Sequence, residues 1–247
     1  MPCAFHALSD TGRVRHQNED SVAVVPEAGL AVLADGMGGY KAGEVASRMT
    51  TQLIAHQLGG WLLSGESTPQ AVQQALLDSI QGANRSVFEA ACQQVDYQGM
   101  GTTLVVAVFQ GARLTVGHVG DSRLYRLRQG LLMALTHDHS WLQQQIDAGL
   151  IDPSLAHLSQ HRNLVTRAVG VGPQVLADVT TFDTQPGDTY LLCSDGLHDM
   201  LSPEQLTAIL LREPELPRAA HALLQAANQA GGLDNISLVL VQCQTAA

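Results

Sequence analysis

Residues 103–135 read TLVVAVFQGARLTVGHVGDSRLYRLRQGLLMAL, and this stretch decides the fold class. Four short apolar runs are interrupted by Gly111, by the Gly120-Asp121 corner and by Gly130. A parallel pair of strands needs a crossover of a dozen or more residues, and these gaps are far shorter. The spacing therefore predicts antiparallel strands at 103–109, 114–119, 124–127 and 131–135.

The remainder of the chain alternates between blocks of strands and blocks of helices. The patterns predict strands at 21–25, 30–33, 175–182, 188–193 and 236–242, and helices at 44–58, 70–92, 140–149, 203–212 and 217–230. This grouping is typical of an α+β fold in which helices cover two antiparallel sheets. No repeat, charge run or low-complexity linker divides the sequence, which indicates one domain over 1–247. Residues 151–162 are polar and irregular and resemble a mobile flap, and the whole flap segment is expected at about 140–165.

The charge balance argues against two classes of partner. Lys+Arg total 13 against 23 Asp+Glu, which gives a formal net charge of -10. Nucleic acid and anionic membranes both need a basic face, so neither is expected as the main partner. No apolar run is long enough for a secretory signal or a membrane span. We expect a soluble, cytoplasmic protein that acts as a monomer.

The four cysteines are widely scattered and form no C-x-x-C pair. They indicate neither a zinc site nor a disulfide framework. We expect them to be small buried residues in a reducing compartment.

Acidic residues recur at the ends of the predicted strands, most of them beside a glycine. They are Glu19, Asp20, Asp35, Asp121, Asp195 and Asp234. Any one of them would be read as a turn former or a helix cap. Together they predict a cluster, and clustered carboxylates repel one another unless cations neutralise them. Oxygen ligands without a Cys or His set favour Mg²⁺ or Mn²⁺ over zinc, and Gly36 would let a backbone carbonyl approach the ion closely.

Other phosphate-binding and hydrolytic motifs do not match. Residues 38–43 have the glycine spacing of a P-loop, but Glu44 and Val45 stand where Lys and Ser/Thr are required. The dinucleotide pattern fails at Lys41, and no H-E-x-x-H, EF-hand or G-x-S-x-G sequence occurs.

Six stretches resemble, in order, the motif series of the PP2C family of metal-dependent serine/threonine protein phosphatases, and in particular its compact bacterial branch. They are RHQNEDS (15–21), DGMGG (35–39), GMGTT (99–103), VGDSR (119–123), SDGL (194–197) and DN (234–235). Each motif alone is weak, but their order and spacing extend the resemblance from about Asp10 to Val241.

The resemblance implies a four-layer αββα sandwich with two central antiparallel sheets and a metal site at one edge. It also implies a role for each matching residue. Asp35 would bridge two metal ions, Asp195 and Asp234 would complete the first metal site, and Glu19 with the Gly36 carbonyl would complete the second. Asp20 would hold metal-bound waters, Asp121 with Asp195 would form a third metal site, and Arg15 would bind the substrate phosphate. A water between two cations would attack phosphorus in line, while the metals and Arg15 offset the phosphoryl charge. Arg15 and Asp35 are thus the expected catalytic residues, and Arg13 is the alternative if the register slips by two.

Two departures from the family pattern affect the proton donor and the flap. Met37 stands where some members place a His, and a thioether cannot donate a proton, so no general acid is assigned. His118, His137 and His139 lie near the motifs, and packing or turn roles are expected for them. In the flap, Ser159-Gln160-His161-Arg162-Asn163 lacks the His-Pro found in bacterial relatives, which leaves substrate preference open.

Two other functions remain as alternatives. One is a catalytically inactive module that binds phosphoproteins, and the other is a hydrolase of small phosphomonoesters. The expected partners are phosphoprotein substrates and a serine/threonine kinase whose action the protein opposes, and the expected cofactor is Mn²⁺ or Mg²⁺ in two core sites and a third.

Overall fold

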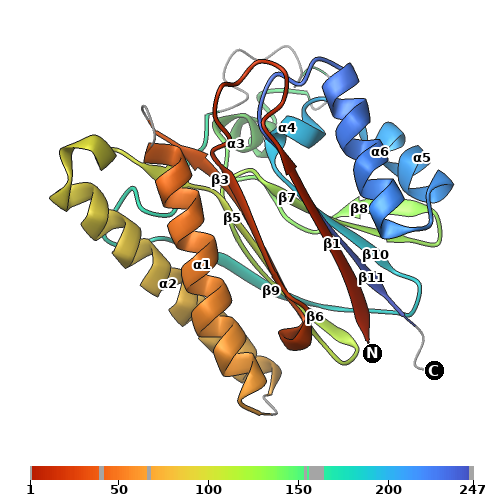
Figure 1. The fold of residues 1–247 in the computed structure, drawn as a ribbon, viewed down its shortest axis with the longest axis horizontal. Helices are drawn as coiled ribbons and strands as arrows, with labels where there is room; N and C mark the ends of the chain where they lie inside the picture. The colour runs from red at the N-terminus through yellow and green to blue at the C-terminus, as the bar shows by residue number, and fades with distance from the viewer. Residues whose placement is uncertain (1, 39–41, 66–67, 153–154, 156–163, 245–247) are drawn as a thin grey trace.

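The computed structural model describes residues 2–38, 42–65, 68–152, 155 and 164–244. In this part of the chain, two antiparallel sheets lie face to face and a layer of helices covers the outer face of each (Figure 1). The predicted α+β class and the αββα order of layers are both confirmed. No described helix is both long and apolar enough to cross a membrane.

The first sheet contains both ends of the described chain. Its strand order is β1 (Cys3–Asp10), β11 (Ile236–Cys243), β10 (Thr189–Cys193), β7 (Arg123–Arg128) and β8 (Leu131–Ala134). The N- and C-termini consequently lie near each other at one end of the molecule (Figure 1).

The second sheet is built on the strand that leads into the DGMGG motif. Its order is β2 (Asp20–Val25), β3 (Leu30–Met37), β5 (Leu104–Gln110), β6 (Arg113–Val119) and β9 (Asp178–Asp183), with the short β4 (Gly101–Thr102) paired to β3. A one-turn helix at Pro26–Ala28 joins β2 to β3, and another at Val95–Tyr97 precedes β4.

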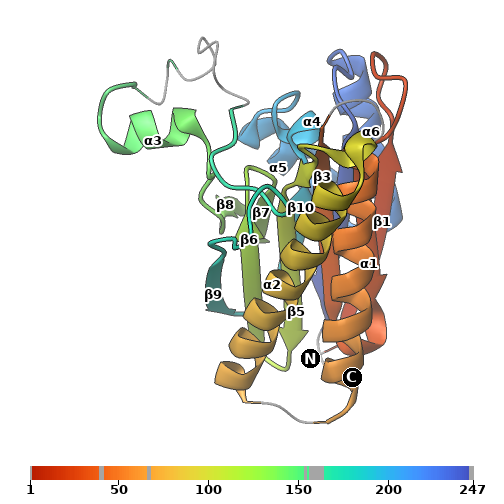
Figure 2. The same cartoon turned by 90° about the vertical axis from the view of Figure 1, so that its left-hand side faces the viewer.

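Helices complete the outer layers. α1 (Ala42–Leu63) and α2 (Pro69–Gln93) cover the second sheet, whereas α5 (Pro203–Arg212) and α6 (Leu216–Gln229) cover the first. α5 begins in a capping box, in which Ser202 and Gln205 each bind the other's backbone N–H. The short α4 (Asp195–His198) follows β10, and α3 (Trp141–Asp147) stands apart from the helix layers at the same end of the molecule as α4 (Figure 2).

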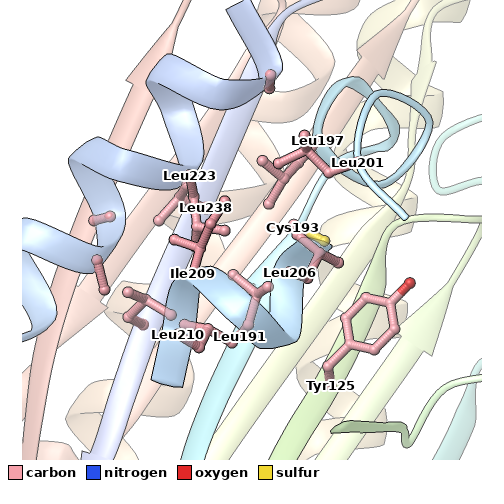
Figure 3. Close-up of a cluster of buried hydrophobic side chains, with 14 of the residues drawn as sticks. Tyr125, Leu191, Cys193, Leu197, Leu201, Leu206, Ile209, Leu210, Leu223 and Leu238 are labelled. Atoms are coloured by element: carbon pink, nitrogen blue, oxygen red, sulfur yellow. The ribbon is translucent and has the colours of Figure 1, made fainter. Parts of the chain in front are cut away.

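Three apolar cores separate the four layers, because the central strands are buried on both faces. In β3, Leu30 and Val32 pack toward α1 and α2, while Ala31 and Leu33 pack between the sheets. The third core lies between the first sheet and α5 and α6, where Leu206, Leu223 and Leu238 meet (Figure 3). This double burial explains why the strands read as continuous apolar runs rather than as an alternation.

Most predicted elements are present, with a few differences. The strands β1 and β4 and the short helix α4 were not predicted. The strand predicted at 175–182 begins only at Asp178, because Val175 is buried against α2 and its carbonyl accepts a hydrogen bond of 2.5 Å from Gln81 Nε2. The helix predicted at 140–149 is confirmed as α3, while residues 153–154 and 156–163 of the predicted flap lie outside the described residues.

Candidate metal centre

Two of the predicted carboxylates face each other on neighbouring strands. Asp20 begins β2 and Asp35 lies near the end of β3, and they are direct partners in the antiparallel register. Direct partners carry their side chains on the same face of a sheet. Asp20 is only 8% exposed, and its Oδ2 accepts a hydrogen bond of 2.8 Å from Ser194 Oγ, just after β10. This bond fixes the end of one sheet to the end of the other.

The remaining aspartates reach the same edge from both sheets. Asp121 lies in the turn between β6 and β7, Asp195 is the first residue of α4, and Asp234 lies two residues before β11. They line a hollow of about 260 Å³, together with Arg15, Glu19, Asp35, Gly36, Met37, Gly38, Thr103, Val165 and Asn235. Of the predicted site residues, only Asp20 is not part of this lining. It lies next to Asp35 and contributes to the field there.

Two glycines explain how the backbone comes this close. A side chain on Gly36 would overlap the backbone carbonyls of Gly43 and Glu19, so the first turn of α1 packs directly against the end of β3. Gly120 has a φ of +102°, a conformation that side chains disfavour, and a Cβ there would lie 2.7 Å from Thr103. The glycines beside the carboxylates therefore admit close packing of the backbone at this edge of the sheets.

The carboxylates perturb one another strongly. Burial raises the pKa of Asp35 well above its ordinary value, and the nearby charges of Asp20, Asp195 and Asp121 raise it further. Burial likewise raises the pKa of Asp20 to about 6, and that of Asp121 and Asp195 to about 7. Each shift has the sign expected for negative charges gathered away from water with too little positive charge nearby.

The donor set fits a hard divalent cation. Asp20 Oδ1 and Asp195 Oδ1 are buried without a hydrogen-bond partner, which is costly for a carboxylate unless a cation takes the free position. The acidic lining supplies oxygen donors only, which suits Mg²⁺ or Mn²⁺. In the described residues, no group of three or more His, Cys, Asp or Glu side chains is placed closely enough to hold a metal ion as it stands.

Arg15 lies at the rim of the hollow. Its Nη2 donates a hydrogen bond of 2.6 Å to Asp234 Oδ2, and its side chain remains 54% exposed. The bond to Asp234 raises the pKa of Arg15. Arg13 takes a different position, because its backbone N–H binds Gly232 O and its Cγ lies close to Gly232. Arg15, and not Arg13, is thus the arginine in the lining.

Several contributors belong to the six motifs but had no predicted role. Asn235 accepts a hydrogen bond from the Glu19 N–H and donates to the carbonyls of Thr11 and Gln17, so it holds the loop that carries Arg15. Thr103 Oγ1 accepts from the Asp35 N–H. Asn235 directly follows an expected ligand in the sequence, and that adjacency was the signal that could have identified it. Met37 lines the hollow, so this position lacks a proton donor.

The three histidines near the motifs make structural contacts. His118 Nε2 lies 3.0 Å from Ser122 O, and the Gly120 N–H donates to His139 Nδ1 at 3.1 Å. Burial lowers the pKa of His118 to about 4, so this ring is neutral at physiological pH. His137 forms an exposed pair with Asp147 of α3. The contacts of the buried His118 and His139 agree with the packing roles expected for them, whereas His137 is exposed.

Comparisons with known proteins converge on one family. The profile described as protein phosphatase 2C matches residues 13–230. The chain is 42% identical over 241 residues to the serine/threonine protein phosphatase PstP of Mycobacterium tuberculosis, covering 96% of this chain and 44% of PstP. It therefore spans less than half of that relative.

A second relative and a solved structure match over nearly their whole length. The serine/threonine phosphatase stp of Listeria monocytogenes is 36% identical over 238 residues, covering 95% of this chain and 93% of stp. The crystal structure of the catalytic domain of PstP in complex with two manganese ions superposes with a TM-score of 0.88 at 37% identity, covering 98% of this chain and 99% of that one.

Proposed function

The chain belongs to the protein phosphatase 2C family of serine/threonine protein phosphatases, and we propose that its carboxylate-lined hollow is the divalent-metal centre at which it hydrolyses phosphoserine and phosphothreonine in proteins. The observation that carries the proposal is the hollow itself. Five acidic side chains from both sheets line it, and burial has raised the pKa of Asp35, Asp121 and Asp195. Such a site is stable at neutral pH only with added positive charge.

Each expected metal-site residue has a proposed place. Asp35 would lie between two ions, with Asp195 and Asp234 on the first, Glu19 and the Gly36 carbonyl on the second, and Asp121 with Asp195 on a third. Asp20 would orient water at the site, held by its bond from Ser194. When bound, Mn²⁺ or Mg²⁺ supplies Lewis acidity toward the phosphoryl group and makes water more acidic.

Arg15 would bind the substrate phosphate. Its guanidinium is exposed and already at the rim, and its planar fork matches two phosphate oxygens. The bond to Asp234 orients the side chain toward the hollow, so an incoming dianion and a carboxylate compete for the same donor. Met37 contributes no proton, and the leaving alkoxide must take one from another source.

A protein substrate agrees better with the site than a small metabolite does. The described lining offers one cation, Arg15, which binds a phosphoryl group but recognises nothing beyond it. The complete set of acidic residues argues against an inactive phosphoprotein-binding module. A protein phosphatase of this kind would oppose a serine/threonine kinase, which we propose as its functional counterpart.

The test compares substrates and metals on the same preparation. We expect turnover of a phosphothreonine peptide in millimolar Mn²⁺ or Mg²⁺, loss of turnover with EDTA, and at least ~10-fold slower turnover of free phosphoserine and sugar phosphates. Asp195→Asn should lower kcat by at least ~10³-fold, because it removes a charge shared between ions. Full activity after exhaustive chelation, or a variant that keeps a tenth of the wild-type rate, contradicts the metal assignment. Faster turnover of the small phosphoesters would instead identify a phosphomonoesterase.

A further inference from the structure

Two cysteines that are 240 positions apart meet at the end of the molecule that is remote from the metal centre. Cys3 begins β1 and Cys243 ends β11, and the two residues are direct partners in the antiparallel register. Their Sγ atoms are 3.4 Å apart, and both residues are present as thiols. Figure 1 shows the two chain ends side by side at this point.

The backbone geometry at this pair suits a disulfide. The hydrogen bond between the two strands is made one residue further along, where the Gln244 N–H donates to Pro2 O. The backbone of Cys243 faces away from Cys3: its N–H donates to Asp188 O and its carbonyl accepts from the Gly187 N–H. Cys3 and Cys243 therefore form a non-hydrogen-bonded pair, in which the Cα atoms are about 4.5 Å apart. That separation is within the range spanned by disulfides, and a bond of roughly 2.0 Å needs only a modest approach of the sulfurs.

The two thiols differ in access and in reactivity. Cys3 is partly exposed and lines a cavity of about 630 Å³ together with Phe5, Leu62 and Phe109, whereas Cys243 is 1% exposed. The hydrogen bond between them lowers the pKa of Cys3 and raises that of Cys243. The more accessible sulfur is thus also the one more readily deprotonated, and the thiolate is the reactive form.

We propose that Cys3 and Cys243 form a thiol–disulfide pair that a small-molecule disulfide, such as oxidised glutathione, closes reversibly. The Cys3 thiolate attacks one sulfur of the oxidant and releases the first thiol, leaving a mixed disulfide on Cys3. Cys243 then loses its proton to solvent and attacks Cys3 Sγ, which releases the second thiol. The protein loses two electrons and two protons, and the oxidant becomes two molecules of the reduced thiol.

Closure acts on stability and leaves the metal centre unchanged. β1 and β11 are each 8 residues long, and their opposite ends, at Asp10 and Ile236, lie next to the Asp234 loop. At about 3.3 Å per residue the bridge is more than ~20 Å from that loop. It would tie the first strand to the last and close nearly the whole chain into a ring, which restricts the unfolded state.

The first experiment uses the unmodified chain. After incubation with oxidised glutathione, peptide mapping without reduction should find a Cys3–Cys243 disulfide. Cys92, which is exposed, should carry glutathione, and Cys193, which is buried, should remain a thiol. The melting temperature should rise by on the order of 10 °C and return on reduction, while phosphatase activity stays within ~2-fold.

Two variants separate the roles of the sulfurs. Cys243→Ala should trap glutathione on Cys3 and lose the rise in melting temperature. Cys3→Ala should leave Cys243 unmodified, and Cys92→Ala should behave like wild type in both the bridge and the melting shift. The proposal is overturned if the wild-type chain forms no 3–243 bridge, if only Cys92 reacts, or if the bridge forms without stabilising the protein. None of these outcomes depends on whether the metal centre is active.

Discussion

A guanidinium and a carboxylate that meet at 2.6 Å, Arg15 Nη2 and Asp234 Oδ2, have different tasks in the proposed reaction. In that proposal, Asp234 would help to hold a metal ion and Arg15 would bind the substrate phosphate. The pair stabilises the site in the absence of ions, because the positive charge of Arg15 offsets part of the negative charge of Glu19, Asp195 and Asp234. Binding of ions and substrate would then replace one set of charge pairs by another, and the ions would supply the positive charge that the clustered carboxylates lack.

Replacing Arg15 tests that division of labour. Arg15→Ala should raise KM with a smaller fall in kcat, a loss on the order of 2–3 kcal/mol in kcat/KM, because a charge-assisted bond to phosphate already exists in the ground state. Mn²⁺ affinity should not weaken, since the substitution frees Asp234. Steady-state kinetics and calorimetric Mn²⁺ titration measure the two effects.

Arg13→Ala provides the matched control for this position. Its side chain lies at Gly232, outside the described lining, so the change should be much milder. A larger effect from Arg13→Ala, or a loss of Mn²⁺ affinity in Arg15→Ala, would contradict the phosphate assignment.

At the scale of the elements, a second arginine joins the two sheets at their other end. Arg128, at the end of β7, donates from Nε and Nη2 to both carboxylate oxygens of Asp188, at 2.7 and 2.6 Å, and from Nη2 to the carbonyl of Asp183, at the end of β9. Tyr190 and the Gln185 N–H also donate to Asp188. Burial alone would raise the pKa of Asp188, but these bonds outweigh it and hold the pKa below its ordinary value.

Removing this arginine should destabilise the whole domain. The Asp188 side chain is 1% exposed, so Arg128→Ala leaves a buried carboxylate without its charge partner, at a cost of about 3 kcal/mol in the free energy of unfolding. Arg218→Ala, which removes an exposed pair with Glu215, should cost less than ~0.5 kcal/mol. Urea denaturation of both variants measures the two losses in the free energy of unfolding. Equal losses would show that the pair of Arg128 with Asp188 stabilises the fold no more than an exposed pair does.

The elements also show where prediction from sequence succeeds. Strands such as β3 and β5 are continuous apolar runs between turn residues, and double burial makes that signal strong. The stretch 3–10, CAFHALSD, has neither a continuous apolar run nor a clean alternation, and it becomes β1 because β11 offers it a pairing edge. Its structure is determined by a partner more than two hundred residues away, which local patterning does not contain.

In the candidate site, too, local sequence patterns predict some features, and contacts between distant segments determine the others. Carboxylates beside glycines at strand ends were predicted to gather, and the described structure places all but Asp20 around one hollow. The bond between Arg15 and Asp234, the anchoring of the 11–19 loop by Asn235, and the contact between Cys3 and Cys243 were not predicted. Each depends on distances between segments that only the folded chain brings together.

For the whole molecule, the clustered carboxylates link stability to pH and to metal. In the unfolded chain an aspartate loses its proton near pH 3.9. In the folded chain the pKa of Asp20 is about 6 and that of Asp121 and Asp195 about 7. Between the pKa values of the unfolded and the folded chain, the folded state binds more protons than the unfolded state. The stability that these groups contribute is therefore lost as the pH rises toward 7.

Divalent ions should reverse that loss, because they offset the repulsion among the deprotonated carboxylates. In EDTA the melting temperature should fall between pH 5.5 and 7.5, and the gain on adding Mn²⁺ should be larger at pH 7.5 by at least ~5 °C, which corresponds to ~2 kcal/mol for a domain of this size. Asp195→Asn, with one charge fewer, should show a shallower fall in EDTA and a smaller gain from Mn²⁺. Differential scanning calorimetry at both pH values gives the comparison. A gain from Mn²⁺ that is equal at the two pH values, or greater at pH 5.5, would mean that these carboxylates do not hold the metal.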